Sequence, residues 1–397
     1  MSKRIAIAVV GTLGDVQPYL ALATALQKSG YSVVLGAPVD FEPMIRSYGV
    51  EFYNLGSNIK SFLTQSRFES AMSKNLIVNA PALLAQGQKI VDTAARHAWR
   101  MAQNADLIVL HMNTSFCIDI AEALNIPAVM TAMQPLNTTR EFPFCAYYGP
   151  PMGPTLNRMT YTALGVAMVY WNLPRNRLRK EVLGLKPRSK TGSFFTDTRG
   201  RPLATLYAYS PLVAPRPRDW PRTAQLTGYW TLPDNTGWEP SVEFRHWLAA
   251  GQAPVYFGFG SMPFGAKRNT QLLQEGVALW GGRAVVARGW GGIDPRDLPP
   301  TTFAIDRAPH EKLFKYVKAV VHHGGAGTTA AGLRAGVFGQ IGASIDTGEN
   351  EVGEPCFQHM PHTHDDAVGR RAPHSVHPVG NLAHTYRFIE RERMPGA

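Results

Sequence analysis

Cysteine and charged residues are scarce in this sequence. Its 397 residues include only 3 Cys, and 17% of them are charged. Three scattered cysteines are too few for a disulfide scaffold or for a zinc site built from paired cysteines, and they favour a reducing, cytoplasmic location. The apolar fraction of 45% is too high for a disordered chain. We therefore expect a globular protein, and the length predicts two domains.

Long apolar runs are also missing. No stretch approaches the roughly 20 apolar residues of a membrane span. The run Ile5–Val10 is too short for the core of a secretion signal, so we expect a buried strand there. The apolar segment Leu164–Leu173 precedes a basic cluster at Arg175–Lys180. We interpret the two as a core helix with a solvated basic end, and a peripheral contact with the inner face of a membrane is the alternative.

Three motifs of other enzyme classes are absent. The sequence contains no Asp-x-Asp, no His-Glu-x-x-His and no Gly-x-Ser-x-Gly. We therefore expect no dedicated metal site in the body of the chain and no serine hydrolase. In the tail, His359, His362, His364 and Asp365 are close enough in sequence to chelate a metal, but a poorly ordered tail is the favoured interpretation.

Positive charge exceeds negative charge. Forty Lys and Arg against 29 Asp and Glu give a formal net charge of +11. This balance favours a phosphorylated substrate or an anionic surface as a partner. We do not expect nucleic acid, because no recognised module and no stripe of basic and aromatic residues accompanies the charge.

Strand and helix patterns alternate in two parts of the chain. In the first part, strands are predicted at Ile5–Val10, Tyr31–Leu35, Leu107–Leu110 and Ala128–Thr131, and helices at Val16–Ser29 and Phe116–Leu124. In the second part, strands are predicted at Val255–Phe259, Ala284–Ala287, Thr302–Ile305, Ala319–His322 and Gln340–Asp346, and helices at Gln271–Trp280, His310–Tyr316 and Thr328–Ala335. This alternation predicts an α/β fold with two doubly wound parallel sheets.

Proline and turn residues suggest where the domains meet. We predict a first domain at 1–210, a linker at 211–235, a second domain at 236–345 and an atypical tail at 346–397. In such sheets, ligands bind at the carboxyl ends of the strands, so the loops that follow strands are the place to look for chemistry.

The first predicted strand ends in GTLGD, from Gly11 to Asp15. A glycine turn that opens a helix can bind phosphate through its backbone N–H groups. The turn lacks the full G-x-G-x-x-G fingerprint, which disfavours a Rossmann enzyme that uses NAD. From spacing alone, Asp15 is either an N-cap of the helix or a general base, and both interpretations stay open.

A second glycine-rich loop, VHHGGAGTT from Val321 to Thr329, also links a predicted strand to a helix. Its glycines let backbone approach a ligand closely, and its histidine and threonines offer hydrogen bonds beside the free N–H groups of the helix. This combination predicts a diphosphate site. A third loop carries Ser261, which is either a further phosphate contact or part of a plain turn.

Seven stretches of the chain carry a family resemblance. They are GTLGDVQPYLALATAL from Gly11 to Leu26, TREFP from Thr139 to Pro143, YSP from Tyr209 to Pro211, VYFGFGSM from Val255 to Met262, RGWGG from Arg288 to Gly292, APHEKLF from Ala308 to Phe314, and HHGGAGTTAAGLRAG from His322 to Gly336. Together they resemble the nucleotide-sugar glycosyltransferases of the GT-B type, of families 1 and 28. The sterol 3-beta-glucosyltransferases and the related antibiotic glycosyltransferases are the members most similar to it.

The resemblance implies two Rossmann-like domains facing a cleft and an inverting hexosyltransferase. The expected reaction moves a hexose from a nucleotide diphosphate sugar, UDP-glucose or a dTDP-sugar, to a hydroxyl of a sterol or another lipophilic acceptor, without a metal or cofactor. Asp15 matches the family's base, and the acceptor pocket is expected in the first domain at Ile59–Phe68 and Phe142–Trp171. The residues expected at the donor are Gly14, Ser261, Arg307, His310, His323, Gly325, Gly327, Thr328 and Thr329.

Beyond Gly336 the family pattern is lost. No Asp-Gln pair that would hold the sugar hydroxyls follows, and Asp346, Glu349 and Asn350 are weak stand-ins. The tail is rich in His, Pro and Arg, as is the translation of a GC-rich gene in a shifted reading frame. We therefore hypothesise a frameshift, which the coding DNA would test. We therefore expect an incomplete second domain. The alternative to an active enzyme is a catalytically impaired nucleotide-binding remnant.

Overall fold

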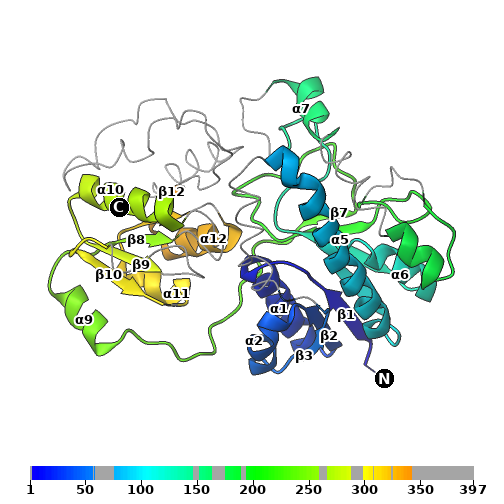
Figure 1. The fold of residues 1–397 in the computed structure, drawn as a ribbon, viewed down its shortest axis with the longest axis horizontal. Helices are drawn as coiled ribbons and strands as arrows, with labels where there is room; N and C mark the ends of the chain where they lie inside the picture. Colours follow the sequence, from blue (N-terminus) through cyan, green and yellow to red (C-terminus); the bar gives the residue numbers. More distant parts are fainter. Residues whose placement is uncertain are drawn as a thin grey trace, which may run out of the picture. The chain divides into compact units, whose positions relative to one another are not determined.

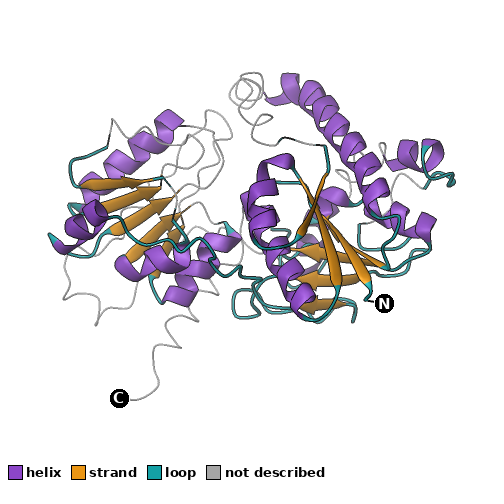
Figure 2. Ribbon diagram, turned by 90° about the horizontal axis from the view of Figure 1, so that it is seen from below, coloured by secondary structure: helices purple, strands orange, loops and turns teal. Residues whose placement is uncertain are grey.

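The computed structural model describes residues 2–56, 58, 76–145, 152–162, 175–188, 194–258, 266–287, 298–306, 308–322 and 325–341. Along the chain, the main boundary between two compact units falls between Pro233 and Asp234. Each unit contains its own sheet, with helices on both sides of it (Figures 1 and 2).

The first unit contains a seven-stranded sheet in the order β3-β2-β1-β4-β5-β6-β7, and all neighbouring strands are parallel. The strands are β1 (Arg4–Ala8), β2 (Ser32–Ala37), β3 (Glu51–Asn54), β4 (Leu107–His111), β5 (Ala128–Ala132), β6 (Ala204–Tyr207) and β7 (Ala224–Leu226). The helices include α1 (Leu13–Lys28), α2 (Glu42–Ser47), α5 (Leu76–Met101), α6 (Cys117–Leu124) and α7 (Pro154–Thr160). The predicted doubly wound parallel sheet is therefore confirmed for this unit.

Strand β1 lies in the interior of this sheet, between β2 and β4. Residues Ile5 to Ala8 are all buried, because helices cover both faces of the sheet (Figure 2). This explains why the strand is a continuous apolar run without alternation. The helix that follows it begins at Leu13, three residues before the predicted start at Val16, since Thr12 already stands at the N-cap in an extended conformation.

Most of the segment predicted as a linker, 211–235, belongs to the first unit, which extends to Pro233. It contains β7, which pairs with β6 at the edge of the sheet. It also contains Trp220, which is buried and stacks on Tyr207 with ring centroids 4.5 Å apart. The Trp220 Nε1–H group donates to the carbonyl of Asn137 at 3.0 Å. Apolar packing therefore holds in the first unit residues that the proline content assigns to a linker.

The second unit contains a five-stranded parallel sheet in the order β10-β9-β8-β11-β12. The strands are β8 (Val255–Gly258), β9 (Ala284–Ala287), β10 (Thr302–Ile305), β11 (Ala319–His322) and β12 (Phe338–Ile341). The helices include α9 (Val242–Ala249), α10 (Ala266–Trp280), α11 (His310–Leu313) and α12 (Ala326–Ala335). The last strand begins at Phe338, two residues before the predicted Gln340. Gly336, in the left-handed conformation, ends α12, and one residue separates it from the strand.

Two of the four basic residues in the predicted cluster at 175–180 are buried, while Arg177 and Lys180 are exposed. The side chains of Arg175 and Arg179 are 2% and 5% exposed, and both contact the fully buried carboxylate of Asp119 on α6. Arg175 Nε donates to Oδ2 at 2.6 Å, and Arg179 Nη1 donates to Oδ1 at 2.8 Å. The expectation of a solvated basic end is therefore wrong for these two residues, and neither offers its charge to a membrane surface.

Three predicted segments lie outside the described residues. These are the first acceptor segment Ile59–Phe68, the apolar run Leu164–Leu173 and the tail 346–397. Among the helices that are described, none combines the length and the apolar character needed to cross a bilayer.

We expect Asp119→Ala to destabilise the first unit by about 3–5 kcal/mol, because it leaves two buried guanidinium groups without their shared carboxylate. Asp92→Ala is the matched control, since Asp92 pairs with the exposed Arg177 at 3.1 Å and contributes less than about 1 kcal/mol. Urea unfolding followed by circular dichroism measures both. Equal midpoints for the two variants would contradict a structural role of the buried cluster.

Candidate functional site

The turn between β1 and α1 holds the carboxylate of Asp15 in a defined position. Asp15 is the third residue of α1, and its Oδ2 accepts hydrogen bonds from the backbone N–H of Thr12 at 2.7 Å and from the Thr12 hydroxyl at 3.3 Å. The side chain is 31% exposed. Asp15 is therefore not the N-cap, although it does satisfy an N–H group at the start of the helix.

Gly11 makes this position of Asp15 possible. A Cβ atom at residue 11 would lie 2.1 Å from Oδ2 of Asp15 and 2.5 Å from its Cγ, far inside van der Waals contact. The carboxylate thus occupies the space that a side chain at position 11 would fill. Gly14, the other glycine of the turn, is exposed in the first turn of α1, where an added Cβ would meet only the Thr12 hydroxyl at 3.8 Å.

The second oxygen of Asp15 faces His111. Nε2 of His111 lies 3.7 Å from Oδ1 of Asp15, and the imidazole is buried at the carboxyl end of β4, the strand next to β1. The backbone N–H of Asn113 donates to Nδ1 of His111 at 3.4 Å, which places the ring proton on Nε2. Burial lowers the pKa of His111, and the negative charge of Asp15 and a hydrogen bond to the backbone of Val10 oppose this effect only in part. The imidazole is therefore neutral and lies beside the carboxylate.

One aromatic ring packs against His111, and a second ring packs against the first. Tyr19 lies one turn after Asp15 on α1, is fully buried and contacts His111 edge to face, with ring centroids 5.7 Å apart. Its hydroxyl bonds to the Thr131 hydroxyl on β5. Trp230 meets the other side of Tyr19 at 5.9 Å. Three strands and α1 thus fix the surroundings of one carboxylate, and His111, Tyr19 and Trp230 were not among the predicted site residues.

A sequence signal for His111 does exist. It directly follows the apolar run Leu107–Leu110, and neighbouring parallel strands end at the same edge of a sheet. A polar residue at the end of the strand next to β1 is therefore a candidate partner for Asp15. The sequence does not say which strands are neighbours, and here β4 lies beside β1 while β2 lies on its other side.

In the second unit, the structure brings four predicted donor residues together at the start of α12. Gly325 stands at the N-cap, and Gly327, Thr328 and Thr329 lie in the first turn. The Thr329 hydroxyl donates to the carbonyl of Gly325 at 3.0 Å, so that it supports the turn. The N–H groups of a first turn have no acceptor within their helix and carry partial positive charge, which suits a negatively charged group.

The other predicted donor residues divide into two groups. His310 is the first residue of α11, and its Nε2 lies 3.2 Å from the hydroxyl of Tyr256. Ser261, Arg307 and His323 lie outside the described residues. The described residues contain no cluster of three or more His, Cys, Asp or Glu side chains that could hold a metal ion.

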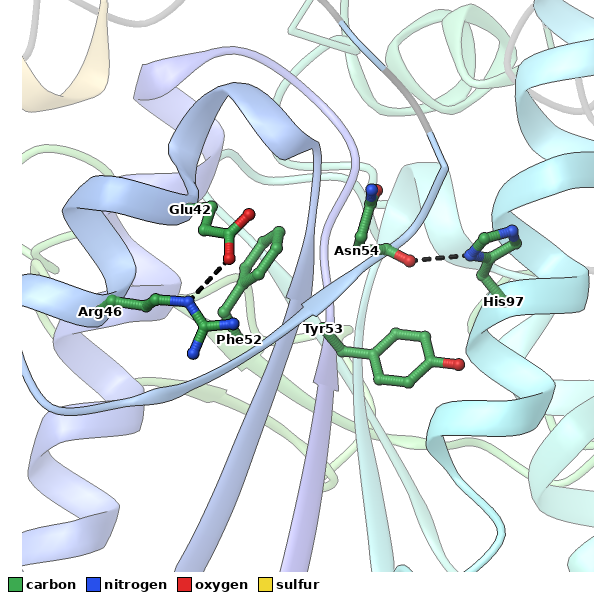
Figure 3. Close-up of a pocket in the computed structure, with 6 residues that line it drawn as sticks. All are labelled: Glu42, Arg46, Phe52, Tyr53, Asn54 and His97. Carbon is green, nitrogen blue, oxygen red and sulfur yellow. Dashed lines mark hydrogen bonds and ion pairs between the residues drawn. The ribbon is translucent and has the colours of Figure 1, made fainter.

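A polar hollow of about 340 Å³ lies elsewhere on the first unit (Figure 3). Its lining residues are Glu42, Arg46, Phe52, Tyr53, Asn54 and His97. Polar groups in it bind one another: Arg46 Nε donates to Glu42 at 2.7 Å, and Nδ1 of His97 lies 2.8 Å from the Asn54 carbonyl. No predicted site residue lines this hollow, so we do not assign a substrate to it.

Comparison with known proteins identifies the first unit. Residues 5–143 match the family model of the glycosyltransferase family 28 N-terminal domain. The match begins at β1 and includes Asp15 and His111.

Curated relatives extend the similarity into the second unit. The chain is 34% identical over 348 residues to the sterol 3-beta-glucosyltransferase UGT80B1 of Arabidopsis thaliana, covering 84% of this chain and 55% of that protein. It is 33% identical over 354 residues to a sterol 3-beta-glucosyltransferase of Aspergillus clavatus, covering 85% of this chain and 24% of that protein. The chain thus spans about half the length of the plant relative and about a quarter of the fungal one.

Solved structures share the fold. CalG4, the calicheamicin glycosyltransferase, superposes with a TM-score of 0.58 at 16% identity over 86% of this chain and 79% of that one. SnogD of Streptomyces nogalater gives a TM-score of 0.55 at 21% identity over 86% of this chain and 81% of that one. VinC, solved in complex with dTDP, gives a TM-score of 0.52 at 18% identity over 85% of this chain and 80% of that one.

At such identities the structural likeness establishes the fold, and the curated relatives establish the kinship. The chain therefore has the GT-B glycosyltransferase fold, matches the glycosyltransferase family 28 N-terminal domain over residues 5–143 and is similar over 84% of its length to a sterol 3-beta-glucosyltransferase.

Proposed function

We propose that this chain transfers a hexose from a nucleotide diphosphate sugar, UDP-glucose in the first place, to the hydroxyl of a sterol or a similar lipophilic acceptor. The position of Asp15 is the observation that carries the proposal. Its carboxylate stands at the carboxyl end of β1, in a family 28 domain, with one oxygen bound to the backbone and the other beside a neutral histidine. The names of the sterol glucosyltransferase relatives support the acceptor class.

The proposed reaction is a single displacement with inversion. The acceptor oxygen attacks the anomeric carbon on the face opposite the diphosphate, and the bond from that carbon to the diphosphate oxygen breaks. The diphosphate leaves with the bonding electron pair, and the acceptor proton passes to Asp15. Because Oδ2 is engaged by Thr12, we assign the proton to Oδ1.

His111 is assigned as a positioning residue for Asp15. Its Nε2 lies 3.7 Å from Oδ1, beside the carboxylate, while hydrogen bonds to the backbone at Asn113 and Val10 orient the ring. With its proton already on Nε2, the imidazole does not take the acceptor proton itself. This assignment makes Asp15 the sole base of the described site.

The donor is assigned to the start of α12. There the first-turn N–H groups between Gly325 and Thr329 would stabilise the diphosphate as negative charge develops on it. Helix N–H groups do this work in place of a cation, so we propose a reaction that needs no metal. VinC, a neighbour in fold, was solved with dTDP, which makes dTDP-sugars the second donor class to try.

We expect Asp15→Asn to lower turnover at least about 100-fold, because an amide cannot accept the proton. Nucleotide binding stays near the wild-type value, since Asp15 is assigned to the acceptor. Asp106→Asn is the control, as Asp106 also binds a backbone N–H of the same unit, that of Arg4 at 2.7 Å. Glucosylation of a sterol panel, read by mass spectrometry, measures the effect, and unchanged turnover in Asp15→Asn would refute the assigned base.

We expect UDP-glucose or a dTDP-sugar to raise the thermal midpoint of the chain, because a ligand that binds only the folded state stabilises it. EDTA should leave both this shift and the turnover unchanged. A midpoint shift with no detectable transfer to any acceptor would favour the alternative of an impaired nucleotide-binding remnant. Absence of any shift with both donor classes at millimolar concentration would count against the proposed function.

We expect His111 to make the first unit less stable in mild acid. Burial lowers its pKa below the ordinary value of 6.5, so below that pH the unfolded chain binds a proton that the folded chain does not. Stability is therefore present above pH 6.5 and is lost as the pH falls toward the lower folded-state pKa.

Urea unfolding between about pH 7.5 and about pH 5.5 measures this loss. His111→Gln keeps a donor and an acceptor but does not titrate, so its stability should fall less than that of the wild type. Equal slopes for the wild type and His111→Gln would show that His111 does not stay neutral.

A further inference from the structure

Tyr256 lies within the apolar strand β8, yet its hydroxyl reaches a predicted donor residue. Side chains alternate along β8: Phe257 packs in a cluster with Val277, whereas Tyr256 packs on the other face with Leu313 and Phe314. Tyr256 is 2% exposed. Burial raises the pKa of Tyr256, so the hydroxyl keeps its proton and acts as a neutral hydrogen-bonding group.

Gly258 gives the tyrosine ring its room. Residues 256 and 258 lie on the same face of the strand, and a Cβ at position 258 would lie 2.3 Å from the Tyr256 hydroxyl oxygen and 2.6 Å from the ring. Gly258 lies within β8 and is not one of the glycines with positive φ, so its backbone conformation is open to alanine. The ring of Tyr256 is therefore what excludes a side chain there, and it points along the strand toward its carboxyl end.

At that end the hydroxyl meets His310. The Tyr256 oxygen lies 3.2 Å from Nε2 of His310, and the two rings meet edge to face at 5.6 Å. Phe314, one turn later, stacks on the imidazole at 4.8 Å with an interplanar angle of 10°. This hydrogen bond and the two ring contacts help to fix the orientation of the imidazole.

The topology places this contact at the edge of the sheet where the donor is proposed. β8 and β10 are both parallel to their neighbours in the order β10-β9-β8-β11, so their carboxyl ends lie at one edge. His310 follows β10, and α12 with Gly325 follows β11 at the same edge. A residue that orients His310 therefore acts on the donor side of the second unit.

We propose that Tyr256 is a positioning residue that holds His310 in the orientation that binds the nucleotide part of the donor, and that Gly258 is required to leave space for it. The proposal rests on the proposed function and extends it to a residue of the core. Tyr256 touches no substrate itself, so its loss should affect donor binding and leave acceptor binding unchanged.

The first test compares Tyr256→Phe with the wild type. Loss of one neutral hydrogen bond should weaken UDP binding about fivefold by calorimetry and raise the KM for the sugar donor by a similar factor. The kcat and the KM for the acceptor should stay within about twofold of the wild-type values. A loss of folded protein would instead lower the apparent kcat. Tyr316→Phe, which removes a partly exposed hydroxyl of the same unit, is the control and should bind UDP as the wild type does.

The second test asks whether Gly258 acts through the tyrosine. Gly258→Ala should weaken UDP binding at least as much as Tyr256→Phe, because the new methyl group displaces the ring. In the double variant the hydrogen bond is already lost, so the two effects should combine to less than their product. Multiplicative effects would mean that Gly258 acts independently, and they would overturn this part of the proposal.

A third measurement does not depend on nucleotide binding. The side-chain ¹⁵N resonances of His310 in the ligand-free protein should shift in Tyr256→Phe and not in Tyr316→Phe. If the wild type binds no nucleotide while this shift is present, the proposed function fails and the contact stands. If the wild type binds UDP and Tyr256→Phe binds it equally well with unshifted resonances, this inference fails and the proposed function stands.

Discussion

The carboxylate of Asp15, folded back over Gly11, is the interaction on which the first unit's site depends. Its Oδ2 holds the N–H of Thr12, so the turn after β1 and the first turn of α1 form one structure. Its Oδ1 faces His111 at the end of β4. A single side chain thereby links the ends of two neighbouring strands to the start of a helix. The same link holds Oδ1 in a fixed orientation, which a free surface aspartate would not have.

Glycine serves the same physical purpose in both units. At Gly11 the missing side chain makes room for a carboxylate, and at Gly258 it makes room for a tyrosine ring. Neither position has a positive φ, so the reason for glycine is space and not backbone conformation. Each glycine stands at or just after the carboxyl end of a parallel strand. There, small residues allow a large neighbour to turn toward the edge where ligands bind.

Buried charge organises the periphery of the first unit in a different way. Asp119 on α6 binds Arg175 and Arg179 from a later segment. The sequence pattern predicts these two charges at a solvated helix end, but in the structure they are buried. Such a cluster joins segments far apart in the sequence, 56 residues for the closer pair. It is therefore a feature of chain packing that local pattern does not predict, because charge in a sequence is read as exposure unless a partner is known.

The sequence alone determined the alternation of strands and helices, the glycine turns that follow β1 and β11, and the resemblance to GT-B glycosyltransferases. Those features depend on apolar runs and local backbone preference, which are properties of neighbouring residues. Tertiary structure decided that β4 lies beside β1, which brings His111 to Asp15, and that Tyr256 reaches His310 across 54 residues. It also placed Trp220 and β7 of the proline-rich segment in the first unit. These contacts depend on strand order and on side chains distant in sequence, so they arise only when the sheets assemble.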